Sequence, residues 1–212
     1  MGNLTPEALV LYRQQMEKFV TFTGPEWALF SQQLYRRDVR KRETLVQHGQ
    51  VCDEVGFILS GSFRFYFIKE GTEISNYFSF QGELVSSYQS FLKRAPSFPT
   101  IEAMEDTALI CFSHAGLQQL LENPLSGPKM ERFGRLVAEY LICCYEERVV
   151  SFVTQKPEER YRQLLLKQPD LLQRIPQHYV ANYLGITPVS LSRIRKRIAS
   201  APLVKTALAL VA

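Results

Sequence analysis

The sequence predicts an α+β protein: a jelly-roll-like β-roll flanked by helices, then a long helix, then a C-terminal (winged) helix-turn-helix. Short aromatic and β-branched segments separated by turn residues fill the first half of the chain. An apolar stripe at helical spacing runs through residues 130–153, and two short helical segments meet at Gly185. We therefore expect a β-roll domain over residues 1–125, the long helix over 126–154 and a helix-turn-helix domain over 155–212.

Composition narrows the class of protein. The chain has 212 residues, of which 46% are hydrophobic, enough for a real core. Its apolar runs are too short to cross a bilayer, and Met1–Pro6 lacks the pattern of a secretory signal. We therefore expect a cytoplasmic protein without membrane contact. None of the cysteines forms a CxxC pair, so we expect free thiols and no metal or iron–sulfur site; these are Cys52, Cys111, Cys143 and Cys144.

The first elements follow from periodicity and turn residues. Residues Pro6–Leu34 have helical spacing, interrupted at Gly24-Pro25, with a short helix resuming at Glu26. The next hundred residues alternate in polarity between Gly-containing turns, which is typical of strands. The expected strands are Val39–Val46, Val55–Leu59, Phe63–Ile68, Ile74–Phe80 and Ala108–Phe112.

A long helix is expected over Met130–Val153 because apolar residues recur every three or four positions. Such a stripe can pack on its own domain or form a seam between two subunits. The spacing is similar to that of a coiled coil, so we favour the seam and expect a homodimer. The stripe comprises Met130, Phe133, Val137, Tyr140, Leu141, Cys144 and Val149.

Three shorter helices are expected next, over Glu158–Lys167, Pro176–Leu184 and Thr187–Ile198. Gly185 suits the left-handed residue that ends a helix, and Thr187 suits an N-cap followed by proline. An inward apolar set on both helices gives the pattern of a helix-turn-helix, although a generic αα-corner shares part of it. That set is Val180, Ala181, Leu184, Leu191, Ile194 and Ile198.

Charge is concentrated in this last segment. Residues 155–200 carry nine Lys or Arg against three Asp or Glu, a net charge of +6, whereas residues 1–154 are slightly acidic. A basic appendage on an acidic body indicates a nucleic-acid partner, here double-stranded DNA, although a solvated charged surface is the simpler alternative. We expect Arg193 to pair with a guanine edge, Val189 to touch a thymine methyl, and Thr187, Ser190 and Lys196 to contact phosphates.

The order of a β-roll, a long helix and a helix-turn-helix resembles the Crp/Fnr family of transcription regulators. The local matches are Phe57–Ser62, Phe80–Leu84, Glu102–Asp106 and the helix-turn-helix block. The resemblance implies a dimeric DNA-binding regulator with a cyclic-nucleotide-binding-like β-roll, with RNA polymerase and a small-molecule effector of unknown identity as candidate partners. In the family, the residue that matches Arg193 commonly contacts a base. The family's other base-contacting positions fall on Pro188 and Val189, which cannot make the same hydrogen bonds, so we expect an operator different from the usual one of the family.

The resemblance also locates a ligand site and indicates that it has changed. Family members that bind cyclic AMP carry Gly-Glu and, about nine residues later, Arg-Ser or Arg-Thr. Here those positions hold Ser86-Ser87 and Ser97-Phe98. A buried anion without a cationic partner is costly, so we expect no strong cyclic AMP binding. Another ligand could use Tyr88, Arg94 and Ser97.

Other functions have weaker support in the sequence. A cupin-like metal protein needs clustered histidines, and this chain has only His48, His114 and His178. We find no nucleophile elbow, P-loop or dinucleotide fingerprint, so we expect neither catalytic residues nor a cofactor. The remaining alternative is a ligand- or protein-binding β-roll that does not bind DNA. The apolar tail Ala201–Ala212 is short for a wing hairpin and suggests no role.

Overall fold

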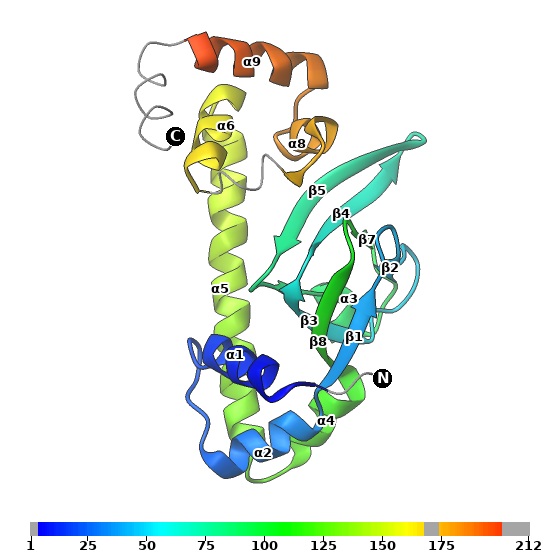
Figure 1. Cartoon of the computed structure of the whole chain (residues 1–212), viewed down its shortest axis with the longest axis vertical. Coiled ribbons are helices and arrows are strands. Elements are labelled where there is room, and N and C mark those ends of the chain that lie inside the picture. The colour runs from blue at the N-terminus through cyan, green and yellow to red at the C-terminus, as the bar shows by residue number, and fades with distance from the viewer. Residues whose placement is uncertain (1–3, 168–173, 201–212) are drawn as a thin grey trace. The chain divides into compact units, whose positions relative to one another are not determined.

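The computed structural model describes residues 4–167 and 174–200 (Figure 1). The tail Ala201–Ala212, whose role the sequence left open, lies outside these residues. The described chain forms two compact units. The second begins within the long helix α5, after Tyr145, and also includes Ile74–Asn76.

Two capped helices open the first unit. Helix α1, Pro6–Met16, starts where the Thr5 hydroxyl accepts a hydrogen bond from the Ala8 N–H at 3.3 Å. Helix α2, Gly24–Gln32, starts with a capping box between Thr23 and Glu26. The two expected helices are confirmed. The interruption precedes Gly24-Pro25, because proline fits the first turn of a helix and needs no N–H partner there.

Two antiparallel four-stranded sheets make the β-roll within the described residues. One sheet has the order β1-β8-β3-β6, with bounds Tyr35–Val39, Thr107–Ser113, Glu54–Ser60 and Leu84–Val85. The other has the order β2-β7-β4-β5, with bounds Thr44–Val46, Thr100–Ala103, Ser62–Lys69 and Thr72–Phe80.

The expected single strand over Val39–Val46 is wrong. Strand β1 ends at Val39, and a turn with Arg42 at φ 70° leads into β2 in the other sheet. Asp106 holds the turn by accepting the Lys41 N–H at 2.8 Å, a partner remote in sequence. Periodicity also missed β6, β7 and helix α3, Tyr88–Lys93, because these elements are too short to show a period.

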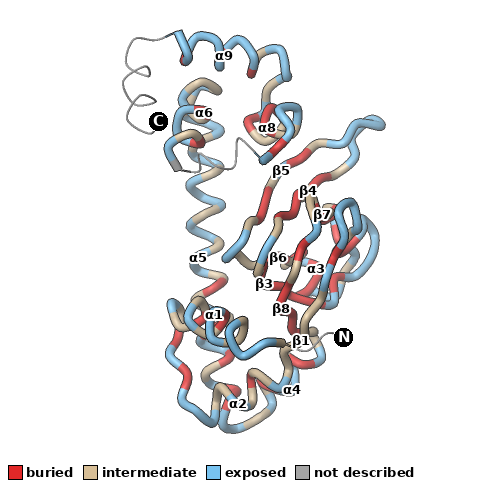
Figure 2. Tube along the Cα trace, in the orientation of Figure 1, coloured by how far each residue is buried: buried red, intermediate tan, exposed pale blue. Residues whose placement is uncertain are grey.

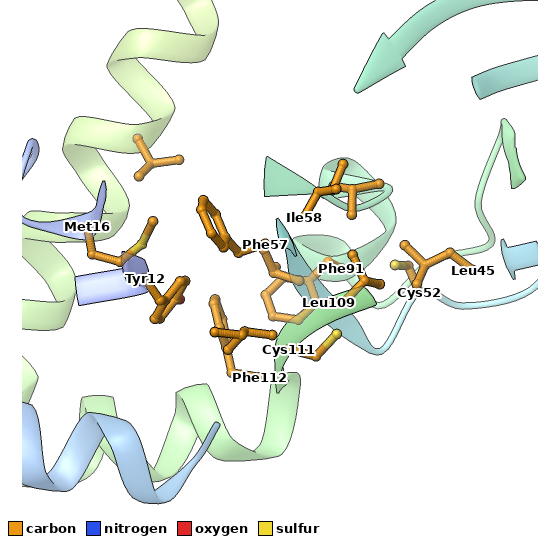
Figure 3. Packing of buried hydrophobic residues seen from close by; sticks show 14 of the residues in the cluster. Tyr12, Met16, Leu45, Cys52, Phe57, Ile58, Phe91, Leu109, Cys111 and Phe112 are labelled. Carbon is orange, nitrogen blue, oxygen red and sulfur yellow. The ribbon is translucent and has the colours of Figure 1, made fainter. Parts of the chain in front are cut away.

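The core of the first unit joins α1 and α3 to the strands (Figure 3). Tyr12 of α1 points toward Phe57 of β3, with ring centroids 5.3 Å apart, and Phe91 of α3 meets Phe112 of β8 at 6.3 Å. Each fully buried large side chain contributes about 1.5–3 kcal/mol through loss of apolar surface to water. The β-roll and its flanking helices therefore share one hydrophobic core.

Helix α4, His114–Glu122, precedes the long helix α5, Gly127–Thr154. The expected length of α5 is confirmed, but the expected seam is partly wrong. Met130, Phe133 and Val137 are only 2%, 5% and 8% exposed because they pack in the core of their own unit. Farther along, no part of α5 is coloured as buried (Figure 2). Its exposed large apolar residues there are Tyr140, Ile142, Tyr145, Val149, Val150, Phe152 and Val153.

The second unit continues with helix α6, Pro157–Lys167, helix α8, Gln177–Tyr183, and helix α9, Pro188–Ser200. All three expected helices are present, with each end within two residues of the expected position. The described residues of this unit after α5 include no strand, so they provide no wing.

Candidate nucleic-acid interface

Helices α8 and α9 form a helix-turn-helix held by a small apolar core. Ala181 is fully buried, and its single methyl group allows α9 to approach closely. Gly185 has φ +70°, the left-handed conformation expected of the residue after a helix. The whole predicted inward set is buried: Val180, Ala181, Leu184, Leu191, Ile194 and Ile198.

Thr187 starts the second helix of the motif. Its hydroxyl accepts the Ser190 N–H at 3.2 Å and lies 3.0 Å from the Ser190 hydroxyl. Pro188 follows as the first helical residue, where it loses no hydrogen bond. The two hydroxyls and the Val189 N–H lie together at one helix end, which is a suitable place for a phosphate oxygen.

The basic side chains of α9 have different partners. Arg197 pairs with Glu158 at 3.1 Å. Arg195 hydrogen-bonds to Tyr161, whose pKa is raised by burial and only partly lowered again by that arginine. Arg193 and Lys196 are exposed, and neither side chain has an ion pair or hydrogen bond with another described residue. Val189 is 61% exposed beside them. The structure thus brings together, on the outer side of α9, the residues that the sequence proposed for DNA.

A groove of about 1010 Å³ runs along α9 and the start of α6. Arg193 and Lys196 line it together with Ser190, one of the expected phosphate contacts. The lining also includes Lys156, Pro157, Glu158, Ile186, Ile194, Arg197 and Ser200. The groove is open to solvent, and four of its five charged lining residues are basic.

Two arginines brace the turn of the motif, a feature that sequence reasoning missed. Arg160 donates to the Leu184 carbonyl at 2.9 Å and Arg148 to the Tyr183 carbonyl at 3.1 Å, which satisfies the C-terminal end of α8. Both guanidinium groups lie over the ring of Phe152, 4.7 and 4.9 Å from its centroid. The only sequence signal for this packing is the spacing of eight residues between Phe152 and Arg160, and such a spacing is too common to predict a contact.

The β-roll positions that match the cyclic AMP cassette are closed by the protein itself. Ser87 and Ser97 are buried, and the Ser97 hydroxyl lies 2.8 Å from that of Ser87 and 2.7 Å from the Pro99 carbonyl. Ser86 donates to the Glu54 carbonyl at 2.9 Å. These hydroxyls therefore have partners within the fold.

The two other expected ligand contacts lie near Ser97 in sequence. Arg94 donates to the Cys52 carbonyl at 2.9 Å and pairs with Asp53 at 2.6 Å, so its guanidinium holds the loop before β3. Tyr88, in the first turn of α3, is half-buried, and desolvation raises its pKa. Arg94 and Ser97 thus bind different partners within the fold, and the described contacts do not join Tyr88, Arg94 and Ser97 in one site.

Burial makes one cysteine inert. It raises the pKa of the Cys111 thiol to about 12, so that thiol stays protonated. No group of three or more His, Cys, Asp or Glu suited to a metal occurs in the described parts of the chain. Within the same residues, no helix has the length and apolarity needed to cross a bilayer.

Comparison with known proteins identifies the class of fold. Residues 36–123 match the family model of the cyclic nucleotide-binding domain, so the β-roll is similar to domains of that family. None of the curated protein sequences matches the chain.

Similar solved structures extend the likeness beyond the β-roll. FixK2 from Bradyrhizobium japonicum has a TM-score of 0.65 and 16% identity over 79% of this chain and 85% of its own. The c-di-GMP responsive global regulator CLP of Xanthomonas campestris gives 0.64 and 18% over 84% and 92%. The catabolite activator protein of Thermus thermophilus gives 0.53 and 19% over 87% and 86%. The resemblance to Crp/Fnr regulators is thereby confirmed for the fold.

Proposed function

We propose that this chain is a sequence-specific, DNA-binding transcription regulator of the Crp/Fnr type that acts as a homodimer in the cytoplasm. In this proposal α9 enters the major groove. Arg193 reads a base edge through its planar guanidinium, and Val189 contacts a thymine methyl. Thr187, Ser190 and Lys196 bind phosphates and fix the orientation of the helix.

The observation that carries the proposal is that the side chains of Arg193 and Lys196 are exposed and unpaired. Both project from a helix whose other face is buried, and neither is neutralised by a described acidic residue. In a helix-turn-helix, exposed cations on the second helix supply both the electrostatic attraction to phosphates and the donors for base recognition. A basic surface needed only for solubility would not have to lie beside a helix start that carries two hydroxyl groups.

The dimer seam in this proposal uses the later part of α5. Ile142, Tyr145 and Val149 are 58%, 60% and 61% exposed, and their spacing of three and four residues puts them on one face. At about 100° per residue, Ile142 lies about 140° around the helix from Val137. One face of α5 can therefore serve the core of its own unit while another serves a partner subunit.

The β-roll in this proposal does not respond to cyclic AMP. The positions that would bind ribose and cyclic phosphate hold Ser87 and Ser97, which hydrogen-bond to each other. A different effector, or RNA polymerase, is the candidate partner of this domain. No catalytic chemistry is assigned to the chain, in keeping with a regulator.

Selection of bound duplexes from a random pool tests the function directly. Purified wild-type protein should enrich a roughly two-fold symmetric sequence, because a two-fold dimer presents two copies of α9 about one helical turn of DNA apart. The matched control is Arg193→Ala, which should still bind duplexes but enrich a degenerate sequence. If the wild-type protein enriches nothing, with or without cell extract as a source of effector, the β-roll is better explained as a docking domain and the proposal fails.

A further inference from the structure

Glu158 is an acidic residue in an otherwise basic groove. It lies in the first turn of α6 and lines the groove along α9 together with Arg193 and Lys196. The charged side chains of the lining are four basic ones and this single carboxylate: Lys156, Arg193, Lys196, Arg197 and Glu158. A DNA phosphate in the groove would therefore meet one repulsive group.

The carboxylate of Glu158 binds two arginines at once. Its Oε1 lies 3.0 Å from Arg162 of the same helix, and its Oε2 lies 3.1 Å from Arg197 of α9. The carboxylate is partly buried, with 29% of the side chain exposed, whereas Arg197 is 67% exposed. Arg197 is thus accessible to solvent, yet its charge is largely balanced by a neighbour.

This pairing has a consequence for binding a polyanion. Each cation placed on a phosphate releases about one counterion, and that release dominates sequence-independent affinity. Arg197 can contribute only by giving up Glu158, and the carboxylate itself repels any phosphate nearby. Base recognition by Arg193 involves neither group.

We propose that Glu158 limits the sequence-independent affinity of the protein for DNA by holding Arg197 away from the phosphates. The inference rests on the proposed DNA-binding function and adds to it a residue that opposes binding. Glu158 sets how tightly all duplexes are bound, while Arg193 sets which duplex is preferred. The two roles are carried by separate side chains in one groove.

The test compares Glu158→Gln with wild type on a duplex selected by the wild-type protein and on a scrambled duplex, each at low and high salt. The variant should bind both duplexes about 3- to 10-fold more tightly at low salt, with an unchanged ratio between them. Its log-affinity should also fall more steeply with log salt, by about one unit for each half-site.

Glu159→Gln is the matched control. It makes the same change in net charge one residue away, but Glu159 does not line the groove and its carboxylate instead accepts the Lys156 N–H at 2.7 Å. We expect less than a 2-fold effect on DNA binding. Equal effects of the two variants would show that overall charge alone matters, and would overturn the inference.

Arg197→Gln completes the experiment. Alone it should change affinity little, since the arginine is already paired. Combined with Glu158→Gln it should cancel much of the gain, because the released cation is what binds phosphate. Weaker binding of Glu158→Gln to the selected duplex would instead make Glu158 a support for α9 and overturn the inference. A wild-type protein that binds no duplex refutes the proposed function itself, which is a different outcome.

Discussion

The β-roll and the helix-turn-helix differ in whether the polar side chains at their predicted sites are buried and hydrogen-bonded or exposed and unpaired. In the β-roll, Ser87 and Ser97 are buried and hydrogen-bond to each other. On α9, Arg193 and Lys196 are exposed and have no partner among the described residues. A polar group satisfied inside the fold contributes to the fold, whereas an exposed and unpaired one is available to a ligand. This difference locates the functional surface better than the family resemblance does, because the resemblance covers both regions equally.

The same contrast holds for the cations of the two regions. Arg94 lies near the position that matches the family's phosphate-binding arginine, but it already binds Asp53 and the Cys52 carbonyl. A ligand phosphate would have to displace these partners before Arg94 could bind it. The groove along α9 offers cations without such competition, except where Glu158 intervenes.

The largest effect is expected from substitutions in the proposed dimer seam on α5. Replacing both Ile142 and Val149 by Asp should give monomers, because unpaired charges would be buried in the seam. Affinity for a two-fold site should fall about 100-fold or more, since the second half-site loses its tethered partner. Sedimentation and a duplex titration measure the two effects.

The matched control for the seam is Leu92→Asp on the β-roll, a residue that is 54% exposed and comparable to Ile142. It should leave both the dimer and the DNA affinity unchanged. Persistence of the dimer in the Ile142→Asp, Val149→Asp variant would show that another surface joins the subunits.

A second comparison uses a glycine from each region. Gly61 has φ +98°, and a Cβ there would lie 2.8 Å from the Thr107 Cα and closer still to its Oγ1, so Gly61→Ala should destabilise the β-roll by about 3 kcal/mol or more. Gly185 has φ +70° and more room, with the nearest Phe152 atom 3.0 Å from the added Cβ, so Gly185→Ala should cost about 1–2 kcal/mol.

The single tryptophan makes the two glycine variants distinguishable. Trp27 packs against Tyr12 and Phe30 in the first unit, so its fluorescence follows unfolding of that unit. Gly61→Ala should shift the fluorescence transition, while Gly185→Ala should weaken DNA binding and leave that transition in place. A fluorescence shift of equal size in both variants would mean that the two regions unfold together.

Arg193→Ala tests base reading on the DNA-binding side of the comparison. It should cost about 1–3 kcal/mol for each half-site on the preferred duplex and relax the preference for that sequence. Fluorescence titrations on selected and scrambled duplexes measure both quantities. An equal loss on the two duplexes would reassign Arg193 to phosphate contact.

Lys196→Ala should have a smaller and different effect. As a phosphate contact, Lys196 contributes similarly to every sequence, so its loss should weaken all duplexes several-fold and lower the salt slope by about one for each half-site. Titrations at several salt concentrations separate this behaviour from that of Arg193. A changed sequence preference with an unchanged salt slope would contradict the assignment.

Sequence reasoning succeeded where structure is local. The Thr187 cap, Gly185 and the inward residues of α8 and α9 are set by neighbours three or four positions away, and all were predicted. It failed where distant residues decide. The turn after β1 depends on Asp106, and strand β7 is too short to show a period. Whether the stripe on α5 faces its own domain or a partner depends on Phe19, which lies 5.9 Å from Phe133 and far away in sequence.

The candidate site shows the same division. The exposure of Arg193 and Lys196 followed from helical geometry alone. Arg197 pairs with Glu158, and Arg148 and Arg160 bind carbonyls at the end of α8. These contacts join separate helices and have no usable signature in the sequence. Basic residues close together in the sequence therefore differ in availability only once the fold is known.

The smallest expected effect tests whether the serine pair of the β-roll belongs to the fold. Ser97→Ala removes the hydroxyl between Ser87 and the Pro99 carbonyl and should destabilise the first unit by about 1 kcal/mol, read from Trp27 fluorescence. The control, Ser200→Ala, removes an exposed hydrogen bond to the Lys196 carbonyl and should leave Trp27 unfolding unchanged, because Ser200 lies in the other unit.

Cyclic AMP supplies the decisive addition to this experiment. If Ser97 serves packing only, millimolar cyclic AMP should stabilise neither wild type nor Ser97→Ala, since a ligand stabilises a protein only in proportion to its binding to the folded state. If cyclic AMP raises the melting temperature of wild type and not of Ser97→Ala, the serine contacts the nucleotide. The contrast between a closed β-roll site and an open surface proposed to bind DNA would then be wrong, because a nucleotide would have to open the Ser87–Ser97 pair in order to bind.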